Sequence, residues 1–297
     1  MNNEILMRRK AELPVITEKF FDVKRIFSSK NEKLARLLPG FFFSYLIRVI
    51  HQEGLNKFMW ENRDKEGLEF VAAILKEFGV HPQVFGIERV PASGKWLIAS
   101  NHPLGGMDGL ALLDAVGRVR KDVVFPVNDL LMNIPNLFEL FIPINKHGSN
   151  AENIQIINDT FASDTAILYF PAGLVSRKQN GVIRDLQWKK TFLTKAKKYQ
   201  RDIIPVFITG RNSNFFYNLA NIRKKIGLKA NIEMLYLVNE MVNLKEKDFH
   251  IYIGHPIPWQ TFDRRYSDQE WSDLVKNHVY SMKDNPDILF PYLKENN

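Results

Sequence analysis

Short apolar segments alternate with segments of helical periodicity along the chain from about residue 83 onward. The apolar segments are bounded by polar or glycine-containing turns, which is typical of buried strands. The segments between them place apolar residues at the three- and four-residue spacing of amphipathic helices. We expect strands at residues 95–100, 123–127, 141–144, 166–170, 203–208, 232–237 and 249–253. We expect helices at residues 108–119, 151–163, 187–199 and 214–226.

This alternation predicts an α/β fold with a mixed, largely parallel central sheet flanked by helices. The first eighty residues have helical patterns instead, at 31–38, 41–56 and 67–78. We therefore expect an N-terminal helical segment followed by an α/β domain, with a C-terminal loop and helix packed on that domain. Their expected bounds are 1–80, 81–262 and 263–297, with the last helix at 268–282.

Hydrophobic residues make up 45% of the chain and charged residues 25%, as in an ordinary globular protein. No apolar stretch is long enough to cross a membrane, and the N-terminus lacks a basic region followed by an apolar core. We therefore expect neither a transmembrane helix nor a secretory signal. The chain has no cysteine, which excludes disulfides, thiolate metal sites and a cysteine nucleophile. This fits a reducing cytoplasm, and we expect no metal and no bound cofactor.

The formal net charge is +8, and the excess of positive charge is local. Residues 177–229 contain 14 Lys or Arg residues but only two acidic residues, Asp185 and Asp202. Such a field attracts phosphorylated small molecules, anionic lipid headgroups, an acidic carrier protein or nucleic acid. Nucleic acid is the least expected of these, because aromatic residues do not interleave with the basic run. A basic face that is merely solvated is the alternative.

The N-terminal segment places aromatic residues beside basic ones. Phe41 and its two neighbours precede Arg48, and Trp60 follows Lys57. This pattern is typical of an amphipathic helix at a membrane interface. A helix packed on the protein core has the same pattern, so the sequence leaves both interpretations open.

The apolar segment that ends at Ser100 is followed directly by Asn101, His102 and Pro103. Two glycines come next, and Asp108 lies where a helical pattern begins. A histidine at the end of a strand can act as a general base when a nearby carboxylate orients its imidazole. We expect His102 and Asp108 to form such a pair. The alternative is that Asp108 only caps the helix and His102 only ends the strand.

Sites in open α/β sheets gather where strands end and loops begin. Three further segments occupy such places: Asn145 with Lys146, 171–173, and 210–212. We expect these loops to meet His102 at one edge of the sheet.

The His102 and Asp108 segment resembles the His-and-Asp block of the glycerolipid acyltransferase superfamily, which includes 1-acylglycerol-3-phosphate acyltransferases and their lysophospholipid relatives. Three further blocks occur in the order that this superfamily uses. They are an aromatic strand ending in a basic residue at 141–146, the run Phe-Pro-Ala-Gly-Leu-Val-Ser-Arg at 170–177, and a strand with proline at 204–206. The resemblance covers about residues 83–258.

The sequence departs from the superfamily pattern in two places. Five residues separate His102 from Asp108, where the superfamily has four, and the glycines of this loop can accommodate the additional residue. Ala172 stands where glutamate is usual, and Arg177 lies two places late. Both features are similar to a hemolysin-like branch that includes makers of amino-acid-containing lipids. The resemblance therefore leaves the headgroup of the acyl acceptor open.

The resemblance implies transfer of a fatty acyl group from acyl-CoA or acyl carrier protein to a hydroxyl of a lysolipid, without a covalent enzyme intermediate. His102 would be the general base and Asp108 would orient it. Amides near Gly105, Gly106 or Gly173 are the candidates for stabilising the oxyanion. The residues expected to bind substrate are Asn101, Lys146, Gly173, Ser176, Arg177, Arg211 and Asn212, of which the three cations would hold anionic groups.

The implied partners are a lysolipid acceptor, the acyl donor and an anionic membrane surface, with the protein bound peripherally on the cytoplasmic side of the inner membrane. Two other functions fit the same residues. One is N-acylation, in which an amino-acid amine is the acceptor. The other is a non-catalytic, basic membrane-binding protein in which the His102–Asp108 pair is only structural.

Overall fold

A computed structural model describes residues 3–30, 32–128, 131–144, 151–244 and 248–293 of the chain. Its main element is a seven-stranded sheet, and a separate two-stranded hairpin lies beside it. The sheet consists, in spatial order, of β1 (Gln83–Phe85), β9 (His250–Ile253), β8 (Asp202–Ile208), β2 (Trp96–Ser100), β5 (Ala166–Tyr169), β3 (Val123–Val127) and β4 (Phe141–Pro143). The hairpin consists of β6 (Arg177–Gln179) and β7 (Val182–Arg184).

The five strands from β8 to β4 run parallel to one another. β9 pairs antiparallel with β8, and β1 pairs parallel with β9. The predicted mixed, largely parallel α/β sheet is therefore confirmed.

Twelve α-helices are present in the part of the chain that the structure describes. They are α1 (Asn3–Ala11), α2 (Val23–Lys30), α3 (Glu32–Leu37), α4 (Gly40–Val49), α5 (Gln52–Glu61), α6 (Gly67–Glu77), α7 (Gly106–Gly117), α8 (Ala151–Ala162), α9 (Thr191–Tyr199), α10 (Asn214–Lys225), α11 (Leu237–Asn243) and α12 (Asp268–Ser281). A 3₁₀-helix, η4 (Ile232–Tyr236), leads directly into α11.

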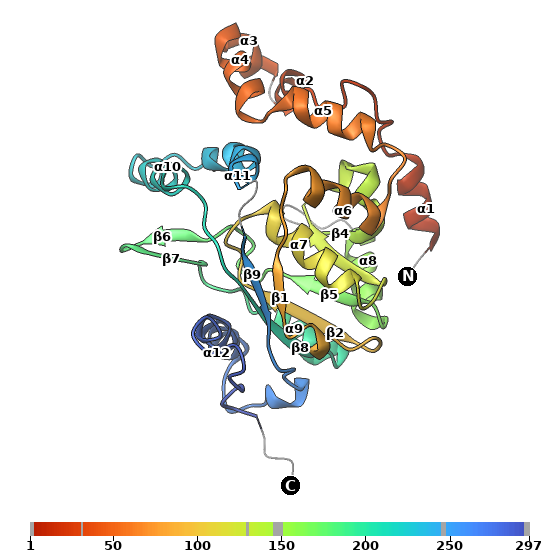
Figure 1. Cartoon of the computed structure of the whole chain (residues 1–297), viewed down its shortest axis with the longest axis vertical. Helices are drawn as coiled ribbons and strands as arrows, with labels where there is room; N and C mark the ends of the chain where they lie inside the picture. The colour runs from red at the N-terminus through yellow and green to blue at the C-terminus, as the bar shows by residue number, and fades with distance from the viewer. Residues whose placement is uncertain (1–2, 31, 129–130, 145–150, 245–247, 294–297) are drawn as a thin grey trace.

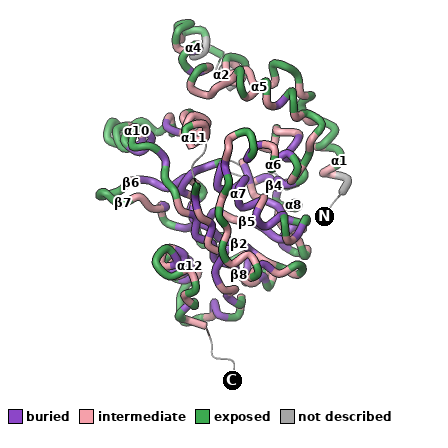
Figure 2. The backbone as a smooth tube through the Cα atoms, viewed as in Figure 1, coloured by how far each residue is buried: buried purple, intermediate pink, exposed green. Residues whose placement is uncertain are grey.

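The sheet lies between two layers of helices, and the residues of its central strands are mostly buried (Figures 1 and 2). Successive side chains of a strand point to opposite faces. In β2, Ile98 belongs to the apolar core shared with α6 and α7, whereas Leu97 and Ala99 belong to the core shared with α8, α9 and α12. Because both faces are covered, the strands are apolar at successive positions, which is the pattern that the sequence shows.

The N-terminal helices differ in how they contact this core. Helices α2 to α5 form an exposed layer at one end of the molecule (Figures 1 and 2). Helix α6 packs on α7 and belongs to the core of the α/β unit. Helix α1 lies beside α8, where Arg9 donates hydrogen bonds to Glu152 and Asn153. The segment 1–80 is thus helical, and its last helix is part of the central core.

Six of the seven predicted strands are present, and the one predicted at 232–237 is wrong. That segment forms η4 and the start of α11, because its buried side chain is Glu233 while Leu235 is 42% exposed. A short apolar run cannot by itself distinguish a strand from a helical turn. The short strand β1 and the β6–β7 hairpin were not predicted.

One buried arginine connects β2 to the end of α8. The guanidinium of Arg201 is fully buried, and burial lowers its pKa to about 10, so it remains charged at neutral pH. A buried cation requires polar partners. Arg201 donates hydrogen bonds to the main-chain carbonyls of Trp96, Thr160, Phe161, Ser163 and Thr165.

His278 makes the stability of this fold depend on pH. Its side chain is buried in α12 against Phe290, and neither ring nitrogen has a hydrogen-bond partner among the described residues. Burial, with a smaller contribution from the charge of His255, lowers the pKa of His278 to about 4. The neutral imidazole therefore stabilises the fold fully above pH 6.5, and this stability is lost as the pH falls towards 4.

We expect the free energy of unfolding of His278→Leu to decrease less than that of the wild type between pH 6.5 and pH 4. The difference between the two decreases should be at most about 3 kcal/mol. The measurement is the free energy of unfolding in urea at several pH values. His81→Leu, at an exposed position, is the matched control and should leave the pH dependence unchanged. Equal slopes for the wild type and His278→Leu would contradict the assignment.

Candidate active site

Three neighbouring parallel strands end at the same edge of the sheet, and the loops that follow them contact one another. The strands are β8, β2 and β5. The loop after β5 reaches the loop after β2 through a hydrogen bond from the main-chain N–H of Ser176 to the carbonyl of His102 (2.8 Å). The loop after β8 reaches it through Asn212, whose side-chain amide donates to the carbonyl of Pro103 (3.2 Å). The predicted convergence on the loop of His102 is confirmed for the segments after β5 and β8, whereas Asn145 and Lys146 lie outside the described residues.

His102 and Asp108 form a hydrogen-bonded pair. Nδ1 of His102 lies 2.8 Å from Oδ2 of Asp108, whose side chain is fully buried. Asp108 lies in the first turn of α7, and its carboxylate also accepts hydrogen bonds from the main-chain N–H groups of Leu104 (2.9 Å) and Gly105 (3.1 Å). The carboxylate thus fixes the loop and the imidazole at the same time.

This arrangement depends on a glycine at position 105. Gly105 has φ of +84°, a conformation that other residues rarely adopt. A Cβ atom at this position would lie 3.1 Å from the side chain of Leu237. The loop therefore turns back onto Asp108 only with glycine here, and the additional residue between His102 and Asp108 is accommodated.

Burial raises the pKa of the Asp108 carboxyl, and the hydrogen bonds from His102, Leu104 and Gly105 oppose this rise. All three partners are N–H donors when the proton of the imidazole is on Nδ1. An ionised carboxylate, which only accepts hydrogen bonds, satisfies all of them. The pair therefore favours the tautomer in which Nε2 of His102 is a free base.

Phe170 covers one face of the imidazole of His102. The two rings are stacked, with centroids 4.3 Å apart and an interplanar angle of 19°. Phe125 supports Phe170 in an edge-to-face contact at 5.2 Å. The side chain of His102 remains 16% exposed, and Nε2 has no hydrogen-bond partner in the described part of the chain. The ring is thus held at Nδ1 by Asp108 and on one face by Phe170, and its Nε2 edge is left for a reactant.

The sequence is similar to that of known acyltransferases. The family model described as acyltransferase matches residues 25–288. The chain belongs to this acyltransferase family. It is 46% identical to a lyso-glycine lipid O-acyltransferase of Bacteroides thetaiotaomicron and 45% identical to one of Phocaeicola vulgatus. Each match spans 263 residues, which is 88% of this chain and 97% or 94% of the relative.

A solved structure gives a more distant match. The 1-acyl-sn-glycerophosphate (LPA) acyltransferase PlsC from Thermotoga maritima aligns with a TM-score of 0.44 and 18% identity. The alignment covers 82% of this chain and 93% of that protein.

Two asparagines that were expected to bind substrate make hydrogen bonds to the main chain of this acyltransferase. Asn101 is buried, and its side-chain amide pairs with both the N–H (2.7 Å) and the carbonyl (2.8 Å) of Ile208 in β8. Asn212 is also buried and binds Pro103. Their polar atoms act on the loop that carries His102.

Arg177 was expected to hold an anionic group, and its guanidinium already has an anionic partner. Its side chain is 8% exposed and donates to the fully buried carboxylate of Glu233 at 3.0 Å. Glu233 also binds Arg223 at 2.8 Å. Burial lowers the pKa of Arg177. Because a buried charge without its partner is strongly destabilising, this arginine is committed to Glu233 in the structure.

The other residues that were expected to bind substrate differ in their exposure to solvent and in whether their polar groups have partners. Gly173 is exposed with φ of +65°, but its N–H donates to the carbonyl of Phe170. Arg211 is exposed and contacts Asn214, so its guanidinium is accessible to an anion. Lys146 lies outside the described residues.

The site contains a residue that the sequence did not single out as functional. Asp185 is buried and accepts hydrogen bonds from the main chain of His102 and from two side chains. Asp185 stands out in the sequence as one of two acidic residues in the basic span 177–229. That isolation was a usable signal, because a lone carboxylate among many cations is a candidate for a specific buried role.

Replacement of Asp108 tests the pair. We expect Asp108→Asn to lower kcat for acyl transfer by about 10³- to 10⁴-fold, because the amide favours the wrong tautomer of the imidazole. The substitution also places an NH₂ group against N–H donors of the loop. The measurement is steady-state turnover together with the thermal midpoint.

The matched control is Asp114→Asn, on the same helix, which removes only an ion pair with Arg118. We expect this variant to keep its turnover within about twofold of the wild type. Comparable losses in both variants would show that the helix as a whole, and not the pair, is responsible.

Proposed function

We propose that the protein transfers a fatty acyl group from a thioester donor to the hydroxyl of a lysolipid with an amino-acid headgroup. The observation that carries this proposal is the imidazole of His102, held by Asp108 at 2.8 Å with its Nε2 edge unoccupied by the described residues. Similarity to two lyso-glycine lipid O-acyltransferases over 88% of the chain supports the class of acceptor.

The proposed reaction is a direct transfer. Nε2 of His102 removes the hydroxyl proton of the acceptor as its oxygen attacks the thioester carbon. Asp108 stabilises the imidazolium that forms. The attack forms the carbon–oxygen bond and gives a tetrahedral intermediate. When this intermediate collapses, the carbon–sulfur bond breaks and the proton passes from His102 to the leaving thiolate. The donor is an acyl-CoA or an acylated carrier protein, both of which present such a thioester.

Gly106 is the main-chain candidate for stabilising the oxyanion of the intermediate. Of the three amides considered from the sequence, those of Gly105 and Gly173 already donate to Asp108 and Phe170. Gly106 is exposed and is the first residue of α7, where N–H groups have no partner within the helix. It directly follows Gly105, whose N–H binds the carboxylate that holds His102, and a free N–H group there fits a donor to developing negative charge.

The acceptor test uses purified protein with three acceptors: a lyso-glycine lipid, lysophosphatidate and free glycine. Each is supplied with palmitoyl-carrier protein or palmitoyl-CoA, and products are identified by mass spectrometry. We expect an ester of the lyso-glycine lipid as the main product. We expect His102→Ala to lower its rate of formation by at least about 10³-fold, because the general base is removed.

His81→Ala, at an exposed position, is the matched control and should retain full turnover. An amide of glycine as the main product would establish the alternative N-acylation. Full turnover by a folded His102→Ala protein would exclude the general-base role of this residue.

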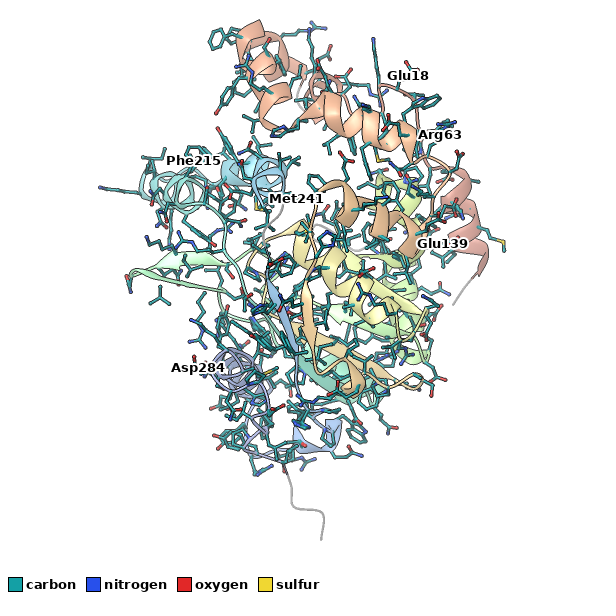
Figure 3. The ribbon with its side chains drawn as sticks, viewed as in Figure 1. Glu18, Arg63, Glu139, Phe215, Met241 and Asp284 are labelled. Atoms are coloured by element: carbon teal, nitrogen blue, oxygen red, sulfur yellow. The ribbon has the colours of Figure 1, made fainter. Side chains whose placement is uncertain are left out.

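We also propose that the protein binds peripherally to anionic lipid on the cytoplasmic side of the inner membrane. Among the described residues, no helix is both long and apolar enough to span a bilayer. Large apolar side chains are nevertheless exposed on α4 and α10, which lie at the same end of the molecule (Figures 1 and 3). They are Phe41 (76% exposed) and Tyr45 (48%) on α4, Phe215 (51%) and Ile222 (57%) on α10, and Ile226 (68%) directly after α10.

These two helices are connected through η4. The hydroxyl of Tyr45 lies 2.8 Å from that of Tyr236, and the ring of Phe215 contacts the ring of Tyr236 edge to face at 4.9 Å. The last turn of α10 carries two exposed cations, Lys224 and Lys225, and Arg223, whose guanidinium pairs with Glu233. Apolar side chains bordered by cations are suited to the interface of an anionic bilayer, where each nearby cation contributes about 1 kcal/mol.

We expect Phe41→Glu with Ile226→Glu to weaken binding to phosphatidylglycerol-containing vesicles by at least about tenfold, because both side chains would leave the lipid phase. The measurement is vesicle sedimentation at low salt. Leu289→Glu, which alters a 57% exposed apolar residue of the C-terminal segment, is the matched control and should bind as the wild type does. Equal binding by all three proteins would contradict the assignment of this surface.

A further inference from the structure

We propose that Asp185 is a positioning residue for acyl transfer: its carboxylate holds the main chain of His102 and thereby sets the direction of the imidazole. This inference rests on the proposed function of His102 as the general base. It assigns a second buried carboxylate to the site. Asp108 binds the imidazole ring of His102, whereas Asp185 binds the main-chain N–H of the same residue.

The contacts of Asp185 are specific. One carboxylate oxygen, Oδ1, accepts hydrogen bonds from the main-chain N–H of His102 (3.2 Å) and from the hydroxyl of Ser176 (2.5 Å). The other oxygen, Oδ2, accepts from the indole N–H of Trp188 (2.9 Å). Asp185 is only 4% exposed. A group that only accepts hydrogen bonds therefore meets three donors in a buried place, which an ionised carboxylate satisfies and an alanine cannot.

Both polar groups of the His102 main chain are held by the same short segment. Its N–H donates to Asp185, and its carbonyl accepts from the main-chain N–H of Ser176 (2.8 Å). The β6–β7 hairpin lies between Ser176 and Asp185, and its first and last residues, Arg177 and Arg184, pair with each other. The hairpin thus brings together two residues that are nine positions apart, at the place where they bind His102.

Asp185 is itself fixed by α12. Its main-chain N–H donates to the hydroxyl of Tyr280 (2.8 Å), and its carbonyl accepts from the ammonium group of Lys276 (2.9 Å). The C-terminal helix therefore supports the carboxylate from behind. A shift of about 1 Å in a catalytic group can cost about 100-fold in rate, so the support of the peptide at His102 has a direct consequence for turnover.

The experiment separates positioning from a merely structural role by comparing Asp185→Ala, Asp185→Asn and Trp188→Phe. Trp188→Phe is the matched control, because it removes a donor to Oδ2 and leaves the contacts of Oδ1 with His102 and Ser176 in place. Each variant is measured for its thermal midpoint, for kcat and KM at temperatures where it is folded, and by NMR of the Nδ1–H proton that His102 shares with Asp108. His102→Ala assigns this signal.

We expect Asp185→Ala to lower kcat by about 100-fold, with KM for both substrates within about twofold, and to lose or shift the Nδ1–H signal. Asp185→Asn retains one acceptor oxygen, so its kcat should fall by only about tenfold. Trp188→Phe should lower the thermal midpoint while it keeps the signal and a kcat within about threefold of the wild type. This pattern would support the positioning role.

Three results would overturn the inference. They are equal losses of kcat in Asp185→Ala and Trp188→Phe, an unchanged Nδ1–H signal in folded Asp185→Ala, and a kcat of Asp185→Ala within about threefold of the wild type. Should Asp185→Ala not fold, Asp185→Asn decides, and wild-type kcat with an unchanged signal then overturns the inference. The NMR signal needs no substrate, so a failure of the wild type to acylate a lysolipid would count against the proposed function alone.

Discussion

The geometry of the candidate active site depends on hydrogen bonding of the main chain between β2 and α7. Residues 101–105 belong to neither element and are mostly buried, so their peptide groups need partners outside regular secondary structure. Side chains provide many of these partners: Asp185 binds the N–H of His102, Asn212 binds the carbonyl of Pro103, and Asp108 binds the N–H groups of the next two residues. The direction of the imidazole is a consequence of this network.

The same requirement explains why several residues that were expected to bind substrate have their polar groups occupied by the protein itself. Asn101, Ser176 and Asn212 are buried and bind the loop or its supports. Arg177 is neutralised by Glu233. Polar residues close to the loop of His102 are therefore not all available to a substrate, since an unpartnered buried polar group costs more free energy than its hydrogen bond contributes. Arg211, which is exposed, retains the properties expected of a residue that binds an anion.

The local pattern of apolar and polar residues in the sequence predicted those features that involve residues close together along the chain. The apolar runs identified the central strands, and the strand-to-helix junction identified His102 with Asp108, because only five residues separate the two. The roles of Asp185 and Glu233 depend on contacts with residues 83 and 56 positions away, at His102 and Arg177. No periodicity specifies such contacts. The segment that contains Glu233 was predicted as a strand because most of its residues are apolar. In the structure the buried residue of this 3₁₀-helix is the charged Glu233.

One short segment, which includes Tyr236 and Leu237, connects the proposed membrane surface to the loop of the His102–Asp108 pair. Tyr236, which contacts both α4 and α10, is followed directly by Leu237, against which Gly105 of the catalytic loop is tightly packed. One turn later Met241 on α11 lies beside Gly106 (Figure 3). A lysolipid with its acyl chain still in the bilayer would thus meet α11 next to the loop that carries His102. Because an apolar chain is costly to expose to water, a site that borders the lipid phase needs to extract only the headgroup and its hydroxyl. The apolar side chains of α11 therefore need to pack against the glycines of the loop without covering the Nε2 edge of His102.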